Sequence, residues 1–280
     1  MSTGSPSALA RRAVADTSDP LVVAPPLPLA RAVVDRLRDA GDDEGAHVGC
    51  VRLLCTESVA EATFDDFLAV ADAADAVDRG RLAVRTADDL DASLTLADGR
   101  VHAHLSLFPQ GDDASGAADG GFRDVAAADD SVYEAVAAAY ETEWEDADGY
   151  DFETPGRSTL VESFGDRWPE AVGTLAGLFE AAESLPADDP LGPVTACTLV
   201  AARHRVLTMR LGEWAEEVGF SSRTEIARAK ARLVDAGLVD TEREPVGVGR
   251  PRHRLVVADD RLADAGPVTL LERGREALGS

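Results

Sequence analysis

Six arginines in the last third of the chain occur at spacings that suit hydrogen bonding to DNA. One group lies on a predicted helix and comprises Ser222, Arg223, Thr224, Arg228 and Arg232. An arginine can donate two hydrogen bonds to guanine O6 and N7, and short side chains beside it allow close approach to the major groove. The second group, Arg250, Arg252 and Arg254, lies among glycines and prolines, as expected of a turn that contacts phosphate or the minor groove.

Residues 206 to 257 predict the elements needed to hold these side chains. A first helix has one apolar face, formed by Leu211, Trp214, Ala215 and Val218. Gly219 ends that helix, and Ser222 with Glu225 matches a capping box that begins the next one. A short strand at 206–208 and a hairpin whose strands begin near 238 and end at 257 complete a winged helix-turn-helix.

The second helix of this motif is predicted to have distinct inner and outer faces. Ile226, Ala229 and Leu233 share the inner face, which leaves the arginines on the opposite face or its flank. Lys230 departs from the pattern, because comparable helices usually have an apolar residue there. Its aliphatic stem can lie along the edge of the core, so we assign it no base contact.

The charge distribution supports a polyanionic partner for this region. Residues 203 to 257 contain eleven Arg and Lys against eight Asp and Glu, a local charge of +3, whereas the rest of the chain carries −28. A basic island in so acidic a protein favours DNA as the partner. Winged helices that bind only proteins, and basic hairpins that are merely solvated, are the alternatives.

Composition bounds the class of protein. The 280 residues, 45% of them hydrophobic, can bury a real core in two or three domains. No apolar run approaches the ~20 residues that span a bilayer, and no secretory signal is recognisable, so we expect a cytoplasmic protein that binds no membrane. The 52 acidic residues, with only one lysine, suggest a salt-filled cytoplasm and resemble the composition of haloarchaeal proteins.

The first part of the chain alternates strand and helix signals. Strands are expected at 21–24, 48–55 and 81–85, with helices at 28–38 and 66–79 between them. This βαβαβ order predicts an α/β domain with a mainly parallel sheet and a ligand crevice at the carboxyl ends of the strands. Strands at 93–96 and 100–105 flank Ala97-Asp98-Gly99, a hairpin turn signal.

No arrangement of residues points to catalysis, a metal site or a cofactor. His102 and His104 share one face of a probable strand, but they lack a third ligand, so packing or hydrogen bonding is favoured over metal binding. Cys50, Cys55 and Cys197 are interpreted as buried thiols rather than a disulfide framework, metal site or redox pair. We therefore expect a protein that is not an enzyme.

Five segments follow from these patterns. Residues 1–110 are predicted as an α/β sensor domain, 111–124 as a flexible acidic loop, and 125–188 as a helical linker or dimerisation segment in which Ala-rich helices cover 125–144 and 158–185. The winged helix-turn-helix spans 189–260, with its first helix at 194–205, and residues 261–280 form a C-terminal tail or helix. Aromatic residues in the middle segment are interpreted mainly as core, with a dimer interface or pocket as alternatives.

The stretch LGEWAEEVGFSSRTEIARAKARLVDAGLV, followed by GVGRPRHRL, resembles winged-helix transcription regulators. The whole chain resembles haloarchaeal regulators of the TbsP type, which implies control of central carbon metabolism alongside the sugar-responsive TrmB regulators. Its first part is similar to the phospholipase-D-like, TrmB-like sensor domains of archaeal regulators. The catalytic His-x-Lys-x4-Asp signature is missing, because His102-Ala-His104 stands there instead, and the resemblance therefore implies no hydrolysis.

Together these features favour a homodimeric, sequence-specific transcription regulator whose first domain senses a metabolite or partner. A homodimer is expected because one winged helix reads too few base pairs for promoter specificity. One alternative is a ligand-binding or hydrolytic α/β domain whose winged helix binds proteins. Another is an architectural protein that binds DNA without sequence preference.

Overall fold

A computed structural model describes residues 2–3, 7–8, 10–11, 19–39, 49–106, 122–127, 129–182, 189–244 and 252–279. The chain forms two compact units, Met1–Phe152 and Glu153–Ser280. The boundary between them lies inside the stretch 125–188, which the sequence pattern presents as one helical segment. Within the described ranges, no helix combines the length and the apolar character needed to cross a bilayer.

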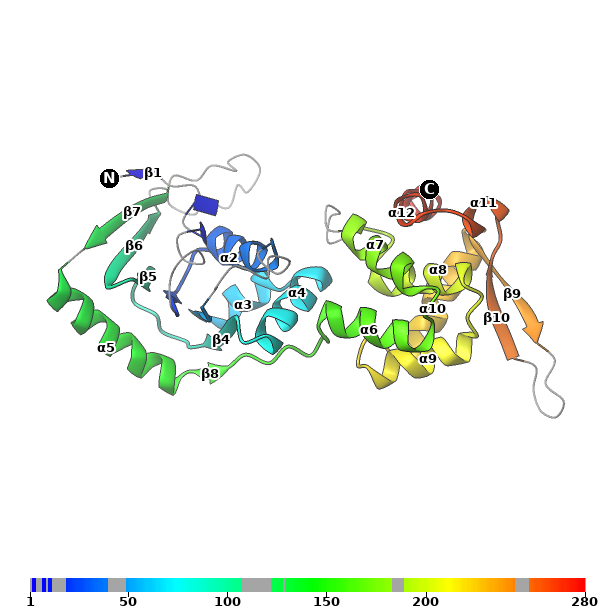
Figure 1. The fold of residues 1–280 in the computed structure, drawn as a ribbon. Coiled ribbons are helices and arrows are strands. Elements are labelled where there is room, and N and C mark those ends of the chain that lie inside the picture. Colours follow the sequence, from blue (N-terminus) through cyan, green and yellow to red (C-terminus); the bar gives the residue numbers. More distant parts are fainter. Residues whose placement is uncertain are drawn as a thin grey trace. The chain divides into compact units, whose positions relative to one another are not determined.

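A mixed sheet forms the centre of the first unit (Figure 1). Its strands are β1 Ser2–Thr3, β2 Leu21–Val23, β3 Val51–Cys55, β4 Leu82–Thr86, β5 Leu94–Ala97, β6 Arg100–Ser106, β7 Phe122–Ala127 and β8 Asp148–Gly149, in the spatial order β1-β7-β6-β5-β2-β3-β4-β8. The helices are α2 Leu27–Asp39, α3 Glu57–Thr63, α4 Phe67–Asp78 and α5 Asp130–Asp146.

The expected βαβαβ order is present, and with it the α/β class is confirmed. Strand β3 pairs in parallel with β2 on one side and β4 on the other. All other pairings in the sheet are antiparallel. The sheet is therefore mixed rather than mainly parallel, because the later strands return through a hairpin and a further antiparallel strand instead of helical crossovers.

The hairpin predicted from Ala97-Asp98-Gly99 is present between β5 and β6. Asp98 and Gly99 have φ of 51° and 70°, so both turn residues adopt the left-handed region that a tight two-residue hairpin turn requires. A Cβ atom built on Gly99 would meet nothing within 4 Å. A side chain at position 99 would therefore lower the stability only through the left-handed backbone conformation.

Gly99→Ala is therefore expected to destabilise the first unit by about 1 kcal/mol, the cost of a left-handed alanine. Urea unfolding of the full chain at constant potassium chloride, followed by circular dichroism, measures this change. Gly99→Asn is the matched control, because asparagine tolerates this conformation better. An equal loss in both variants would contradict a purely conformational cause.

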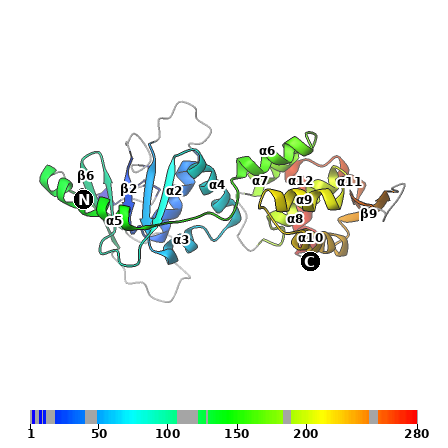
Figure 2. The ribbon, with the colours of Figure 1, turned by 90° about the horizontal axis from the view of Figure 1, so that it is seen from below.

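Helices cover the two faces of the sheet unequally (Figure 2). The face bearing Val22, Leu53 and Val84 packs against α2, α3 and α4 in the larger core. On the other face α5 lies against Leu21, Leu54 and neighbouring strand residues, although none of the helix's own residues is fully buried. The α5 side chains that contact the sheet therefore remain partly exposed to solvent.

Two arginines of the sheet attach the C-terminal half of α5. Arg52 donates to both carboxylate oxygens of Glu141 at 2.7 Å, which lowers the pKa of that carboxyl. Arg85 donates to the backbone oxygens of Trp144 and Glu145 at the end of the helix, where the helix dipole favours a cation. Both guanidinium groups lie over the Trp144 ring, 5.6 and 5.1 Å from its centroid.

Two of the predicted helix boundaries are wrong. Residues 125–127, expected as helix, complete β7, and α5 begins only after Asp129, whose carboxylate accepts from the backbone N–H groups of Ser131 and Val132. The expected helix at 158–185 is two helices separated at Trp168–Ala171, because Pro169 lacks a backbone N–H. Of the predicted loop at 111–124, residues 122–124 belong to β7 and the others lie outside the described residues.

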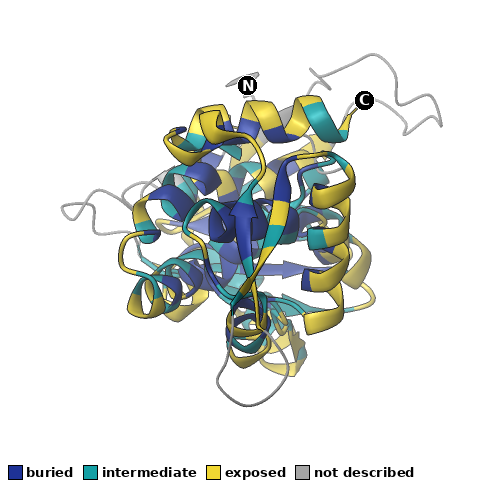
Figure 3. Cartoon of the chain, turned by 90° about the vertical axis from the view of Figure 1, so that its right-hand side faces the viewer, coloured by how far each residue is buried: buried dark blue, intermediate teal, exposed yellow. Residues whose placement is uncertain are grey.

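The second unit is mainly helical, with exposed residues on the outer helices around a buried interior (Figure 3). Helix α8 is buried at every residue from Thr195 to Ala202. The elements are α6 Arg157–Arg167, α7 Val172–Ala182, α8 Pro193–Arg203, α9 Thr208–Glu217, α10 Arg223–Asp235, β9 Val239–Glu244, β10 Arg252–Val257, α11 Asp260–Ala263 and α12 Pro267–Leu278. Helix α12 packs against α7 and α8, so residues beyond 260 contribute to this core.

Of the residues interpreted as packing groups, Cys55, Cys197 and His104 are buried, whereas Cys50 and His102 are half-buried. All three thiols are free. Burial raises the pKa of Cys55 to about 12, which suppresses the reactive thiolate. His104 is buried with Nε2 2.8 Å from Thr95 Oγ1. Among the residues with described positions, no group of three or more His, Cys, Asp or Glu could hold a metal ion.

A hydrogen-bonded cluster joins α7 to the end of α8. Arg203 Nη1 donates to Thr174 Oγ1 at 2.6 Å and to His204 Nε2 at 3.0 Å. Because a guanidinium group can only donate, His204 Nε2 is the acceptor and the imidazole ring is neutral. Burial, together with the positive charge of Arg203, lowers the pKa of His204 below its ordinary value. Protonation of this histidine therefore opposes folding.

Lowering the pH through the ordinary histidine pKa of about 6.5 is expected to destabilise the second unit. The unfolded chain then takes up a proton that the folded chain, with its lower His204 pKa, does not yet accept. The loss should stop once the pH falls below the folded-state pKa. Urea unfolding across this range measures it, and His204→Gln should show a flatter pH dependence than wild type. Identical pH profiles would contradict the assignment.

Candidate nucleic-acid interface

Helix α10 presents the predicted cationic face. Its inner residues Ile226, Ala229 and Leu233 are buried, as expected, against a core to which α8 and α9 contribute. The residues expected to face outward are all exposed, namely Ser222, Arg223, Thr224, Arg228 and Arg232. Lys230, which the sequence set apart, is half-buried at the edge between the two faces.

The predicted capping box fixes where α10 begins. Ser222 Oγ accepts from the Glu225 backbone N–H at 3.2 Å, and the Glu225 carboxylate accepts from the Ser222 N–H at 3.4 Å. Glu225 also accepts from the Ser221 hydroxyl at 2.9 Å. Because these bonds are local, they position the exposed residues at the start of the helix independently of the rest of the fold.

The three arginines on α10 differ in their partners. Arg223 Nε lies 2.6 Å from a carboxylate oxygen of Glu216 on α9. Arg232 donates to the backbone oxygen of Pro190 at 2.7 Å. For Arg228, the structure shows no ion pair or hydrogen bond within the described part of the chain. Arg228 is thus the α10 guanidinium with the greatest freedom to bind a new acceptor.

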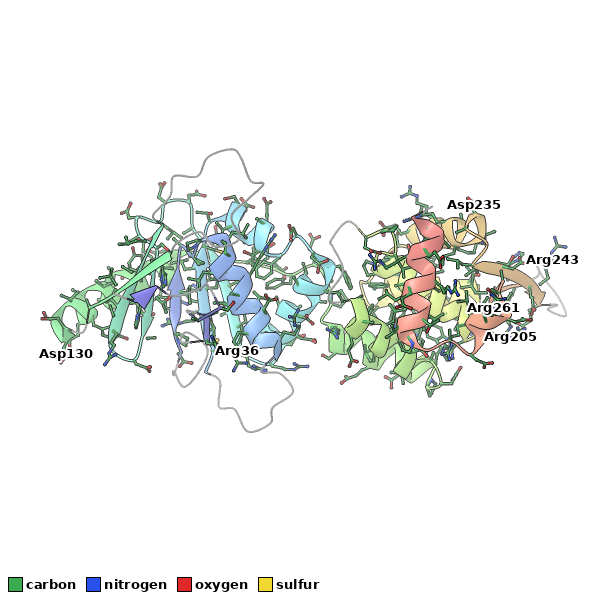
Figure 4. All side chains as sticks on the ribbon, turned by 90° about the horizontal axis from the view of Figure 1, so that it is seen from above. Arg36, Asp130, Arg205, Asp235, Arg243 and Arg261 are labelled. Atoms are coloured by element: carbon green, nitrogen blue, oxygen red, sulfur yellow. The ribbon has the colours of Figure 1, made fainter. Side chains whose placement is uncertain are left out.

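The wing is an antiparallel hairpin of β9 and β10, in which Arg252 lies opposite Glu244 and Arg254 opposite Glu242. Arg254 is held by two contacts, to the backbone oxygen of Arg205 at 2.6 Å and to Glu244 at 2.7 Å. Arg252 is exposed, and Figure 4 shows Arg243 pointing away from the hairpin. Arg250, assigned to the DNA contact, lies outside the described residues, as do positions 245–251.

The strand expected at 206–208 is reduced to one bridge. Leu207 pairs with Arg254, and the Leu255 N–H donates to the Val206 oxygen at 2.9 Å. Thr208 already belongs to α9. The shortening has a local cause, since the helix begins immediately after Leu207.

Sequence reasoning missed a group of carboxylates beside the start of α10, one of which pairs with the predicted Arg223. A recess of about 720 Å³ lies beside the start of α10, and three arginine–glutamate pairs line it together with Trp168. The pairs are Arg167–Glu217, Arg210–Glu213 and Arg223–Glu216. Only Arg210–Glu213 has a signal in the sequence, the three-residue helical spacing, whereas the other two join different helices.

A second recess, of about 410 Å³, lies in the first unit at the carboxyl ends of β3 and β4, where the sequence predicted a crevice. Thr86 ends β4 here, and Glu57 begins α3 directly after β3. Tyr150 and three aspartates, Asp88, Asp148 and Asp151, also line it. The lining is polar and rich in carboxylates, which suits neutral hydroxyl groups or cations better than anions.

Comparison with protein families identifies both units. Residues 3–155 match the family model described as transcriptional regulator TbsP-like, N-terminal, and residues 156–275 match the TbsP-like, C-terminal HTH domain. The chain belongs to the TbsP-like family of transcriptional regulators. This confirms the resemblance drawn from the sequence and places the helix-turn-helix of this TbsP-like chain in the unit that contains α10.

A comparison of the TbsP-like chain with curated proteins found no match. Among solved structures it is similar to TrmBL2, described as an archaeal chromatin protein whose structure shows a novel mode of DNA binding. The identity is 16% and the TM-score is 0.37, over 52% of this chain and 50% of that chain. The TbsP-like chain thus matches about half the length of that protein.

Proposed function

We propose that this TbsP-like regulator is a sequence-specific DNA-binding protein that acts on promoters through α10 and the wing. In this proposal Ser222, Arg223, Thr224, Arg228 and Arg232 serve the major groove, whereas Arg250, Arg252 and Arg254 serve phosphate or the minor groove. The observation that carries it is the outer face of α10, which is exposed and cationic while its inner face is buried in the core. Such a helix can enter the major groove without unfolding any part of the unit.

The proposed roles of these arginines differ because some of them already bind groups of the protein itself. Arg232 and Arg254 are each anchored by a backbone oxygen, which restricts the movement of their guanidinium groups. Arg228 lies one helical turn before Arg232 and, within the described residues, keeps its donors available. We therefore propose Arg228 as the principal base-reading residue of the major-groove group, with Arg254 contacting the DNA backbone.

The same proposal includes a homodimer, an effector and a halophilic host. Two copies are needed because one winged helix reads too few base pairs for promoter specificity. The carboxylate-lined recess at the ends of β3 and β4 supports binding of a neutral or cationic metabolite by the first unit. The net charge of −25 supports a salt-rich cytoplasm, in which counterion release contributes less to binding and direct readout contributes more. The genes regulated would be metabolic ones.

Chromatin immunoprecipitation with the tagged full chain tests the proposal. A sequence-specific regulator is expected to give a small number of sharp peaks at promoters. A continuous low signal along the chromosome would instead indicate an architectural protein, and an absence of signal would indicate a helix-turn-helix that binds proteins. The Arg228→Ala chain, expressed at the same level, is the matched control and should lose the peaks.

A further inference from the structure

Glu216 lies on α9, but its carboxylate binds the first residue of the recognition helix at two points. One oxygen is 2.6 Å from Arg223 Nε, and the other accepts from the Arg223 backbone N–H at 3.4 Å. The Arg223 and Glu216 side chains are 60% and 43% exposed. This carboxylate therefore occupies, at the surface, both a side-chain donor and the backbone donor of Arg223 at the start of α10.

The same two donors would suit a DNA phosphate. Free backbone N–H groups at the start of a helix attract anions, and an arginine beside them strengthens the attraction. A phosphate contact of this kind contains no sequence information and strengthens binding to any DNA. A carboxylate already in that position competes with the phosphate through like charge and through occupation of the donors.

We propose that Glu216 is a specificity-determining residue, which suppresses sequence-independent binding by keeping Arg223 from the DNA phosphates. The inference rests on the proposed DNA-binding function and refines it, because Arg223, assigned above to the major groove, is held by Glu216 and contributes less to binding than Arg228. An acidic residue beside a reading helix weakens the contact common to all sequences and leaves the base contacts of Arg228 to decide where the protein binds.

The two neighbouring glutamates on α9 provide matched controls. Glu213 pairs with Arg210 of its own helix at 3.3 Å, and Glu217 pairs with Arg167 of α6. Glu216 is the member of this trio that contacts α10. Glu217→Gln therefore removes the same charge from the adjacent position without releasing Arg223.

The test measures binding of the full chain to a DNA duplex of random sequence over a series of potassium chloride concentrations. Glu216→Gln is expected to bind roughly threefold to tenfold more tightly than wild type, with a log–log salt slope steeper by about 0.9, because one more phosphate is neutralised. Glu217→Gln should leave the slope unchanged. In an Arg223→Ala background the gain from Glu216→Gln should be clearly smaller, because only the backbone N–H of residue 223 is left to be released.

Two results would overturn the inference. One is an equal effect of Glu216→Gln and Glu217→Gln, and the other is an undiminished gain from Glu216→Gln in the Arg223→Ala background. In both cases, if the wild-type chain binds the duplex, the proposed DNA-binding function is not contradicted. If neither wild type nor Glu216→Gln binds any duplex while circular dichroism shows both folded, the proposed function is wrong and the inference with it. Selection from a random DNA library should also give weaker sequence enrichment with Glu216→Gln than with wild type.

Discussion

Arg228→Ala is expected to weaken binding to promoter DNA by about 1–3 kcal/mol, roughly 5-fold to 150-fold, and to leave the stability of the second unit unchanged. The loss has this size because a bidentate arginine–guanine contact contributes that much discrimination. Stability should not change, because the Arg228 side chain is exposed on α10 and has no ion pair within the described residues. Titration of promoter fragments recovered by immunoprecipitation, at fixed potassium chloride, measures the effect.

Arg273→Ala is the matched control for this experiment. It removes the same charge from an exposed position on α12, where Arg273 pairs with Glu276 three residues later, at 3.0 Å. Its effect on binding should be limited to the small change in overall charge. The loss in Arg228→Ala should also depend on sequence, with little change on random DNA. Equal weakening on promoter and random DNA would reassign Arg228 to phosphate contact.

Trp214→Ala is expected to destabilise the second unit by about 3–5 kcal/mol, the usual cost of deleting a buried aromatic side chain. Trp214 is 1% exposed and packs against Phe164, Trp168 and Phe220, with ring centroids 5.1, 6.1 and 5.5 Å away. Its indole N–H donates to Ser163 Oγ at 3.1 Å. The residue thus joins α9 to α6, and its loss removes packing from both helices.

Urea unfolding of the full chain at constant potassium chloride measures this loss. A stability of typical size, about 5–15 kcal/mol, would be largely removed, so partial unfolding in the absence of urea is an expected form of the result. Two milder variants separate the causes. Ser163→Ala deletes only the hydrogen bond and should cost about 1 kcal/mol, whereas Trp214→Phe keeps most of the packing. A wild-type transition in Trp214→Ala would show that α6 is not part of this core.

Elements whose signals lie within a few residues could be predicted from the sequence. The capping box of Ser222 and Glu225, the apolar spacing of Ile226 and Leu233, and the Asp98-Gly99 turn each satisfy backbone or packing needs locally. The parallel strands β2, β3 and β4 followed from the same kind of pattern, since buried strands alternate with amphipathic helices. The outer face of α10 was predictable for the same reason, because helical spacing alone separates it from the buried face.

Features that depend on distant partners could not be predicted. The residues 125–127 look helical by composition, but pairing with β6 makes them a strand, because a neighbouring edge supplies backbone partners that a local pattern does not encode. The mixed character of the sheet arises in the same way. The break at Pro169, by contrast, has a local signal, because a proline lacks the backbone N–H that a continuous helix needs, whatever the alanine content around it.

The sequence by itself determined that this protein has an α/β unit, a helix-turn-helix and a helix α10 with an exposed, arginine-bearing outer face, because helix periodicity, caps and turns depend on spans of a few residues. The tertiary structure decided which of these arginines already have intramolecular partners. It set Arg232 against the Pro190 carbonyl, Arg254 against Glu244 and Arg223 against Glu216, and it left Arg228 without an ion pair within the described residues. Contacts of this kind join different elements, and hydrogen bonds and charges act through distance in space rather than separation along the chain.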